Sequence, residues 1–224
     1  MSISIVTIIE MAGTMTFAIS GIRLAATKRF DLFGAYVVGL VTAIGGGTIR
    51  DVMLDFTPFW LEDPLYLILT AIALLLVIIS GRYLLHFNNT FFIFDTLGLA
   101  LFTMVGIDKT IGAGFPIWAA VLMGMMTGCF GGVLRDMLVG DVPLLFRRDI
   151  YALASLLGGG VYALLALFGA NANLTSIVVV LSVIVMRLVA VRFQLHLPAL
   201  VHRGRGGTNS KIAVQLQRDR ERRR

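Results

Sequence analysis

Two stretches of the sequence decide the fold: Gly45-Gly46-Gly47-Thr48-Ile49-Arg50-Asp51 and, 85 residues later, Phe130-Gly131-Gly132-Val133-Leu134-Arg135-Asp136. The same shift aligns residues 10–66 with residues 95–151 without a gap. The identical pairs include Gly13/Gly98, Phe17/Phe102, Gly39/Gly124, Pro58/Pro143 and Tyr66/Tyr151. Apolar identities arise by chance in an apolar chain, but paired glycines, an Arg-Asp pair and a proline rarely do. The sequence therefore predicts two related units.

The composition indicates an integral membrane protein. Of the 224 residues 58% are hydrophobic and 14% are charged, and the mean hydropathy is +0.89, whereas soluble domains have about 25% charged residues. A membrane-spanning helix needs about 20 mainly apolar residues. Seven segments meet this need, at residues 3–22, 33–55, 64–82, 90–107, 115–139, 150–169 and 174–192. We therefore expect an all-α integral membrane protein with seven transmembrane helices.

These segments divide into two units of three and one extra helix. We expect the units at residues 1–85 and 86–170, the seventh helix at 171–193 and a basic cytoplasmic tail without fixed structure at 194–224. Because three is an odd number, the second unit enters the membrane from the opposite side, which makes the units inverted repeats. The loops after the first, third and fifth segments hold Lys28, Arg29, Arg82, Arg147 and Arg148. The positive-inside rule then places the N-terminus outside and the C-terminus in the cytoplasm.

Charge and residue types argue against several functional classes. The formal net charge is +6, but residues 192–224 hold nine Lys/Arg and two Asp/Glu, which leaves a net charge of −1 for the rest of the chain. A nucleic-acid-binding module needs a basic folded surface, so we expect no nucleic-acid partner. Cys129 is the single cysteine, and the three histidines show no metal-ligand spacing. The glycine run lacks the Gly-Lys-Ser/Thr ending of a P-loop. We expect no enzyme, no metal site and no cofactor.

The glycines have two competing interpretations. Each glycine in Gly45–Gly47, and in the pair Gly131 and Gly132, weakens a helix by about 1 kcal/mol relative to Ala. Helices interrupted at matching places in two inverted units are typical of a midplane transport site, where freed carbonyls replace part of a cation's hydration shell. The other interpretation is close helix packing, because small residues recur every four positions in two stripes. The stripes are Gly39-Ala43-Gly47 and Gly124-Gly128-Gly132.

The charged residues inside the apolar segments are the strongest functional candidates. A charge at the centre of a membrane helix costs about 2.5–3.5 kcal/mol, so it should face a partner or water. Neighbouring helical residues point about 100° apart, so Asp51 should not satisfy Arg50 fully. We expect each arginine to reach an acid of the other unit: Asp136 or Asp95 for Arg50, and Asp51 or Glu10 for Arg135. These groups line a hydrated path or form a structural ion-pair lock. The tyrosines, Tyr66 and Tyr151 among them, are expected as interfacial anchors without a chemical role.

The paired Gly-Gly-x-x-Arg-Asp motif, at Gly46–Asp51 and Gly131–Asp136, resembles that of the prokaryotic trimeric intracellular cation (TRIC) channel family. That group also carries the label of a putative glycine transporter. The resemblance covers about residues 3–192 and implies a homotrimer in the plasma membrane, with a separate pore in each protomer. It implies permeation of monovalent cations, chiefly potassium, and kinked second and fifth spans that carry the glycine motifs. The pore residues carried over are Gly45, Gly46, Gly47, Arg50, Asp51, Gly131, Gly132, Arg135 and Asp136, and Thr48, Glu10 and Asp95 complete the candidate pathway.

Three functional hypotheses follow from these patterns. The first is a passive potassium-permeable channel whose partners are cations, the lipid bilayer and further copies of the chain. The second is an alternating-access transporter of a small neutral solute such as glycine, which inverted repeats suit equally well. The third is a membrane scaffold in which the glycine stripes only pack helices. A scaffold predicts a dry interior at positions such as Thr48 and Val133.

Overall fold

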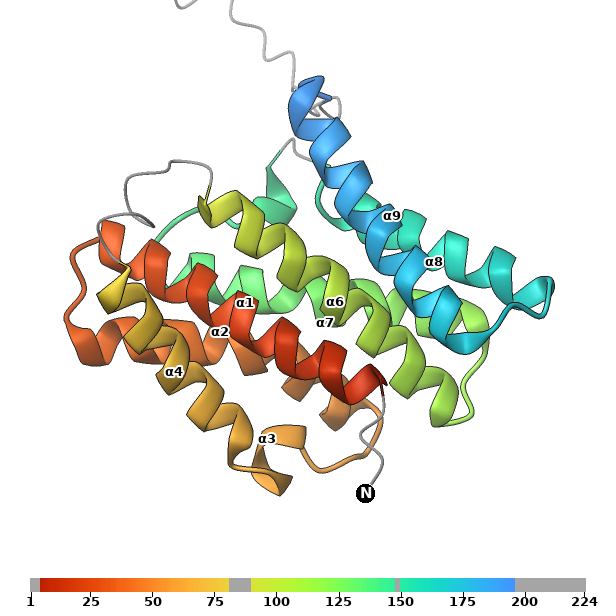
Figure 1. The fold of residues 1–224 in the computed structure, drawn as a ribbon, viewed down its shortest axis with the longest axis horizontal. Coiled ribbons are helices and arrows are strands. Elements are labelled where there is room, and N and C mark those ends of the chain that lie inside the picture. The colour runs from red at the N-terminus through yellow and green to blue at the C-terminus, as the bar shows by residue number, and fades with distance from the viewer. Residues whose placement is uncertain (1–4, 81–89, 148–149, 196–224) are drawn as a thin grey trace, which may run out of the picture.

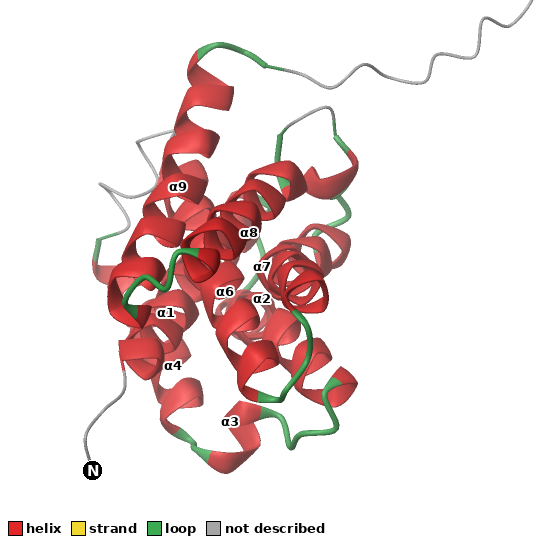
Figure 2. Ribbon diagram, turned by 90° about the vertical axis from the view of Figure 1, so that its right-hand side faces the viewer, coloured by secondary structure: helices red, strands yellow, loops and turns green. Residues whose placement is uncertain are grey.

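The computed structural model describes residues 5–80, 90–147 and 150–195. In these residues the secondary structure is helical, without a strand (Figure 2), which confirms the predicted all-α class. The helices are α1 (Ile5–Thr27), α2 (Leu32–Met53), α3 (Phe59–Glu62), α4 (Leu65–Ile79), α6 (Thr90–Gly112), α7 (Ile117–Leu138), the 3-10 helix η1 (Leu144–Phe146), α8 (Ala152–Leu167) and α9 (Ala172–Arg192). Arg82, Arg148 and the basic tail from residue 196 lie outside the described residues.

Helix length divides the apolar helices into two groups. Five of them in the described residues, α1, α2, α6, α7 and α9, are long and apolar enough to cross a membrane. The helices α4 and α8 are apolar but have 15 and 16 residues. At about 1.5 Å per residue they reach only about 22–24 Å, less than the hydrocarbon thickness of about 30 Å. The expected spans at residues 64–82 and 150–169 are therefore longer than the helices found there.

The helices α1 and α6 form the centre of the structure. They lie side by side and run in opposite directions (Figure 1). Phe17 of α1 stacks on Phe102 of α6, with 5.3 Å between the ring centroids. A Cβ atom at Gly98 would overlap the Phe17 ring, and one at Gly13 would press on the Phe102 ring. Glycine at both places therefore makes room for the ring of the opposite helix.

The remaining helices surround this centre. The helices α2 and α7 pack against α1 and α6 and against each other, while α4 lies on α1 and α2. The helices α8 and α9 pack on one another, α8 also contacts α7, and α9 also contacts α6 (Figure 1). The fold therefore has four central helices with α4 on one flank and the α8–α9 pair on another.

Matching helix ends have the same backbone conformation in the two halves of the chain. After α1 and α6, Arg29 and Gly114 adopt φ values of 61° and 85°. After α2 and α7, Asp55 and Gly140 adopt φ values of 60° and 76°. Glycine adopts this left-handed conformation without steric cost, whereas other residues do not. Asp55 therefore occupies a position where the fold itself favours glycine.

Candidate functional site

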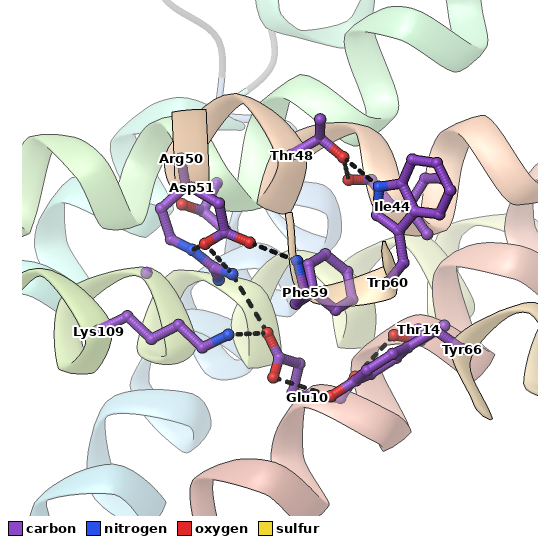
Figure 3. A network of polar contacts seen from close by, with 12 residues as sticks. Glu10, Thr14, Ile44, Thr48, Arg50, Asp51, Phe59, Trp60, Tyr66 and Lys109 are labelled. Atoms are coloured by element: carbon purple, nitrogen blue, oxygen red, sulfur yellow. Dashed lines mark hydrogen bonds and ion pairs between the residues drawn. The ribbon is translucent and has the colours of Figure 1, made fainter. Parts of the chain in front are cut away.

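Arg50 is the centre of a buried polar network, shown in Figure 3. The residue is 0% exposed and lies in the last turn of α2. Its Nε donates to Asp51 Oδ1 at 2.7 Å, and its Nη2 lies 3.3 Å from Glu10 Oε1. The same Glu10 carboxylate accepts hydrogen bonds from Tyr66 Oη at 3.1 Å and from Lys109 Nζ at 2.7 Å. Side chains from α1, α2, α4 and α6 thus meet at one carboxylate.

The second oxygen of Asp51 organises the chain after α2. Its Oδ2 accepts a hydrogen bond from the backbone N–H of Phe59 at 2.9 Å (Figure 3). This bond satisfies a free N–H at the start of α3, as N-terminal capping groups do. The Phe59 ring then lies 5.6 Å from the Arg50 guanidinium carbon and 5.3 Å from Lys109 Nζ. Asp51 therefore positions an aromatic ring beside both cations of the network.

A second network repeats the first with the 85-residue shift. Arg135 is 0% exposed, its Nε donates to Asp136 Oδ1 at 2.9 Å, and its Nη1 donates to Asp95 Oδ1 at 2.5 Å. Tyr151 Oη donates to the same Asp95 oxygen at 3.4 Å, and the N–H of Leu144 donates to Asp136 Oδ2 at 2.9 Å. Each member corresponds to one of Glu10, Arg50, Asp51, Phe59 and Tyr66. We call the two sets the Glu10 cluster and the Asp95 cluster.

The expected pairing of each arginine with an acid of the other unit is wrong. Arg50 pairs with Glu10 and Arg135 with Asp95, both within one unit, and each arginine also bonds the aspartate that follows it. The reason is the antiparallel packing of α1 and α2, which brings the end of α2 beside the start of α1. The long guanidinium side chain can also turn back onto its sequence neighbour at the helix end. Contacts between the units come instead from other groups, such as Ser20 Oγ, which accepts from Arg135 Nη1 at 2.9 Å.

The two clusters differ in their fourth charged group. Lys109 of α6 completes the Glu10 cluster, and its side chain is 28% exposed. Arg187 of α9 lies beside Asp95 and is only 3% exposed, with 4.0 Å between Nη2 and Asp95 Oδ2. Its Nη1 donates to the backbone oxygen of Ile150 at 3.1 Å. Each cluster therefore holds two carboxylates and two cations. Of these four cations Lys109 reaches solvent, whereas Arg50, Arg135 and Arg187 are buried.

A cavity of about 450 Å³ opens beside the Glu10 cluster. It is lined by Asp51, Asp55, Phe56, Thr57, Phe59, Glu62 and Lys109. Three acids and one lysine give this lining a formal charge of −2. A concave surface with this excess of negative charge concentrates cations from solution. Lys109 links the cavity to the buried carboxylate of Glu10.

The glycines do not interrupt their helices, so the expected break is wrong. The helices α2 and α7 are continuous through Gly45–Gly47 and through Gly131 and Gly132. A Cβ atom at Gly46 would overlap the carbonyl oxygen of Thr127, and one at Gly131 would overlap that of Thr42. The two glycines thus allow α2 and α7 to cross in backbone contact.

The small-residue stripes also pack, as their second interpretation predicts. Gly39 lies against Ile22, Gly124 against Ile107 and Gly128 against Thr103, and Ala43 is buried. Gly47 faces the Phe59 ring and Gly132 faces the Tyr151 hydroxyl. Thr48 does not join the charged cluster, because its Oγ1 donates to the Ile44 carbonyl and accepts from Trp60 Nε1 at 3.0 Å (Figure 3).

Four members that contribute polar side chains to the clusters were not among the candidates from the sequence. Tyr66 and Tyr151 were expected at the interface, yet their identity in the repeat was a signal that they share a role. The sequence predicts a loop at Lys109, whereas the residue lies in the last turn of α6. Arg187, an ionisable residue inside an apolar segment, is the type of residue that marks functional sites in membranes. Among the described residues, no group of three or more His, Cys, Asp or Glu is arranged to hold a metal ion.

Sequence similarity to known proteins shows which family the chain belongs to. The model of a family described as glycine transporter matches residues 7–82 and again residues 92–167. The chain belongs to this family. One matched range falls in each of the two units that the sequence predicts. A relative in Escherichia coli K12, the UPF0126 inner membrane protein YadS, is 39% identical over 202 residues, which cover 88% of this chain and 98% of the relative. A UPF0126 membrane protein of Deinococcus radiodurans is 42% identical over 161 residues, covering 70% and 75%.

Solved structures of TRIC channels share the fold of this family member. The TRIC channel orthologue from Rhodobacter sphaeroides superposes with a TM-score of 0.81 and 31% identity, covering 85% of this chain and 99% of that one. A structure described for conductance through TRIC cation channels gives a TM-score of 0.80 and 29% identity, covering 90% and 100%. The resemblance to TRIC channels drawn from the glycine and Arg-Asp motifs is therefore confirmed, and the chain is a multi-pass membrane protein of TRIC-like fold.

Proposed function

We propose that the chain conducts monovalent cations, chiefly potassium, through a pathway in each protomer of a homotrimer. The acidic cavity that ends on the Glu10 cluster is the observation that carries this proposal. The negatively charged lining of the cavity attracts cations, and the buried polar side chains of the Glu10 cluster lie directly behind it. The similarity to structures of cation channels, over 85–90% of the chain, supports it.

The proposed topology has seven spans, with α4 and α8 as short crossings. Residues 1–85 and 86–170 form inverted repeats, α9 is the seventh helix, and the N-terminus faces outside the prokaryotic plasma membrane. The opposite directions of α1 and α6 support the inversion (Figure 1). In this topology the cavity opens to the outside, because it lies after the second span.

The proposed pathway follows the two clusters. Asp51, Asp55 and Glu62 attract cations at the cavity, and Glu10 lies at its inner end. The Asp95 cluster, with Arg135 and Asp136, borders the second half of the route. Arg50 and Arg135 hold the carboxylates in place. The glycines at residues 45–47, 131 and 132 set the distance between α2 and α7 along the route.

Transport of glycine is the second candidate function. The description of the matching family model favours it. The cavity also presents both signs of charge, because Lys109 lines it together with Asp51 and Glu62. A zwitterion could place its carboxylate on the lysine and its ammonium group on an acid.

Reconstituted vesicles distinguish the two functions. We expect rubidium uptake that follows the rubidium gradient and is unaffected by millimolar glycine, because a cation channel has no glycine-binding step. Saturable uptake of labelled glycine, together with no uptake of rubidium, would instead establish the transporter.

A further inference from the structure

An ion pair joins the two units at the end of the molecule away from the cavity. Lys28 Nζ donates to Asp141 Oδ1 at 2.6 Å. Lys28 follows the end of α1, whereas Glu10 lies near its start, so about 27 Å of helix separate the pair from the Glu10 cluster. Asp141 follows the end of α7. The pair therefore bridges the end of the first helix of one unit and the loop after the second helix of the other.

The internal repeat makes the region around Lys28 and Asp141 the counterpart of the cavity in the other unit. Shifted by 85 residues, the cavity residues Asp51, Asp55, Phe56 and Lys109 correspond to Asp136, Gly140, Asp141 and Leu24. Asp141 thus takes the place of Phe56, and the counterpart of Lys28 is the uncharged Ala113. The corresponding position at the open cavity therefore cannot form this ion pair. Asp136, Asp141 and Leu24 are the repeat counterparts of the cavity lining, and we refer to the region around them as the second mouth.

Backbone contacts connect the ion pair to the Asp95 cluster. The N–H of Asp141 donates to the Asp136 carbonyl at 2.8 Å, and the N–H of Leu144 donates to Asp136 Oδ2. The loop that carries Asp141 is therefore held on both sides by Asp136, which bonds Arg135. Ser20, which accepts from Arg135, lies about 12 Å along α1 from Lys28. The pair thus lies beyond the Asp95 cluster on the same side of the molecule.

We propose that Lys28 and Asp141 form a latch that closes the second mouth. The latch rests on the proposed function, since closure regulates conduction only where cations pass. The two side chains are 38% and 30% exposed, and an exposed pair of this kind shifts an equilibrium by about two- to fivefold. Such a weak closure opens and shuts readily, and raised salt weakens it by screening.

Thiol accessibility tests the closure without relying on ion current. The probe is Leu24→Cys in a Cys129→Ala background, so that it is the sole thiol in the chain. A neutral, water-soluble thiol reagent is applied to the reconstituted full chain. We expect Lys28→Glu to raise the modification rate about two- to fivefold, and Lys28→Glu combined with Asp141→Lys to restore the original rate. Arg29→Glu makes the same change in net charge at the adjacent residue and should leave the rate unchanged.

Two results overturn the latch: equal rates for the parent and Lys28→Glu, or a charge-swapped double variant that behaves like the single one. Rubidium uptake by the same variants separates this failure from that of the proposed function. If the parent conducts and Lys28→Glu alters neither rate nor uptake, the latch alone is refuted. If the parent passes no cation while the thiol pattern holds, the conduction proposal fails and the latch stands as a contact that limits water access to Leu24.

Discussion

Two arginines without exposed surface, Arg50 and Arg135, organise the polar interior at the level of single residues. Each arginine is held by two carboxylates. One of them, Glu10 or Asp95, also accepts a hydrogen bond from a tyrosine. Removing one partner of a buried ion pair leaves the other charge uncompensated, which costs more than the intact pair contributes. Neutralising either of the two buried arginines should therefore destabilise the fold.

Arg135→Met tests this dependence. We expect the variant to lose about 3–5 kcal/mol of unfolding free energy, because Asp95 and Asp136 would remain buried without their main cation. Chemical unfolding in detergent micelles measures the loss. Tyr151→Phe is the control, because it removes a single hydrogen bond of 3.4 Å and should cost about 1 kcal/mol. Equal stability of Arg135→Met and the unaltered chain would show that the cluster does not support the fold.

Lys109→Gln tests the electrostatics of the cavity. The substitution changes the formal charge of the lining from −2 to −3 and frees Glu10 from its exposed partner. We expect a larger potassium conductance at low ionic strength, with a difference that shrinks as salt screens the charges. Lys109→Arg keeps the charge and should conduct like the parent. An unchanged conductance of Lys109→Gln across all salt concentrations would place the cavity outside the conducting route.

Asp55→Gly separates the stability of the fold from the attraction of cations. Asp55 has a φ of 60° where the matching helix end has Gly140. Glycine should relieve backbone strain of about 1 kcal/mol, so we expect a higher unfolding temperature. The loss of one acid from the cavity should at the same time lower cation conductance at low salt. A variant that is both less stable and equally conductive would contradict both parts.

At the scale of helices, the sequence was sufficient to place the apolar segments but not their ends. Runs of apolar residues located the helices, since hydrocarbon favours segments whose backbone groups bond internally. The boundary after residue 107 was wrong because α6 continues to Gly112 and carries Lys109 in its last turn. A charge at a helix end can reach the aqueous side, so hydropathy alone ends the helix too early. A run of glycines by itself predicts a break, although the tight packing of α2 on α7 keeps both helices continuous.

Gly46→Ala tests the crossing of α2 and α7. A methyl group at this position would overlap the backbone oxygen of Thr127. Backbone atoms cannot rotate away as a side chain can, so we expect the helices to separate and the unfolding temperature to fall clearly. Gly160→Ala is the matched control, because its new Cβ meets nothing within 4 Å and alanine favours helix. Gly46→Ala protein with the stability of the Gly160→Ala control would refute the close crossing.

At the scale of the whole molecule, the internal repeat predicted which residues share a role but not which residues meet. It paired Arg50 with Arg135, Glu10 with Asp95 and Tyr66 with Tyr151, and the two clusters keep this correspondence. A repeat by itself allows each arginine to pair with an acid of its own unit or of the other unit. The packing of α1 on α2 places the partner in the same unit. The helix α9 lies outside the repeat. Arg187 therefore has no counterpart in the other unit, and the repeat does not predict that it lies beside Asp95.

The most direct test of a cation pathway is single-channel recording of the purified full chain in a planar bilayer under a potassium chloride gradient. We expect discrete openings whose current reverses near the potassium equilibrium potential, because the acidic cavity admits cations and repels chloride. Intact protein that gives no openings, or openings that reverse near the chloride equilibrium potential, would contradict the account.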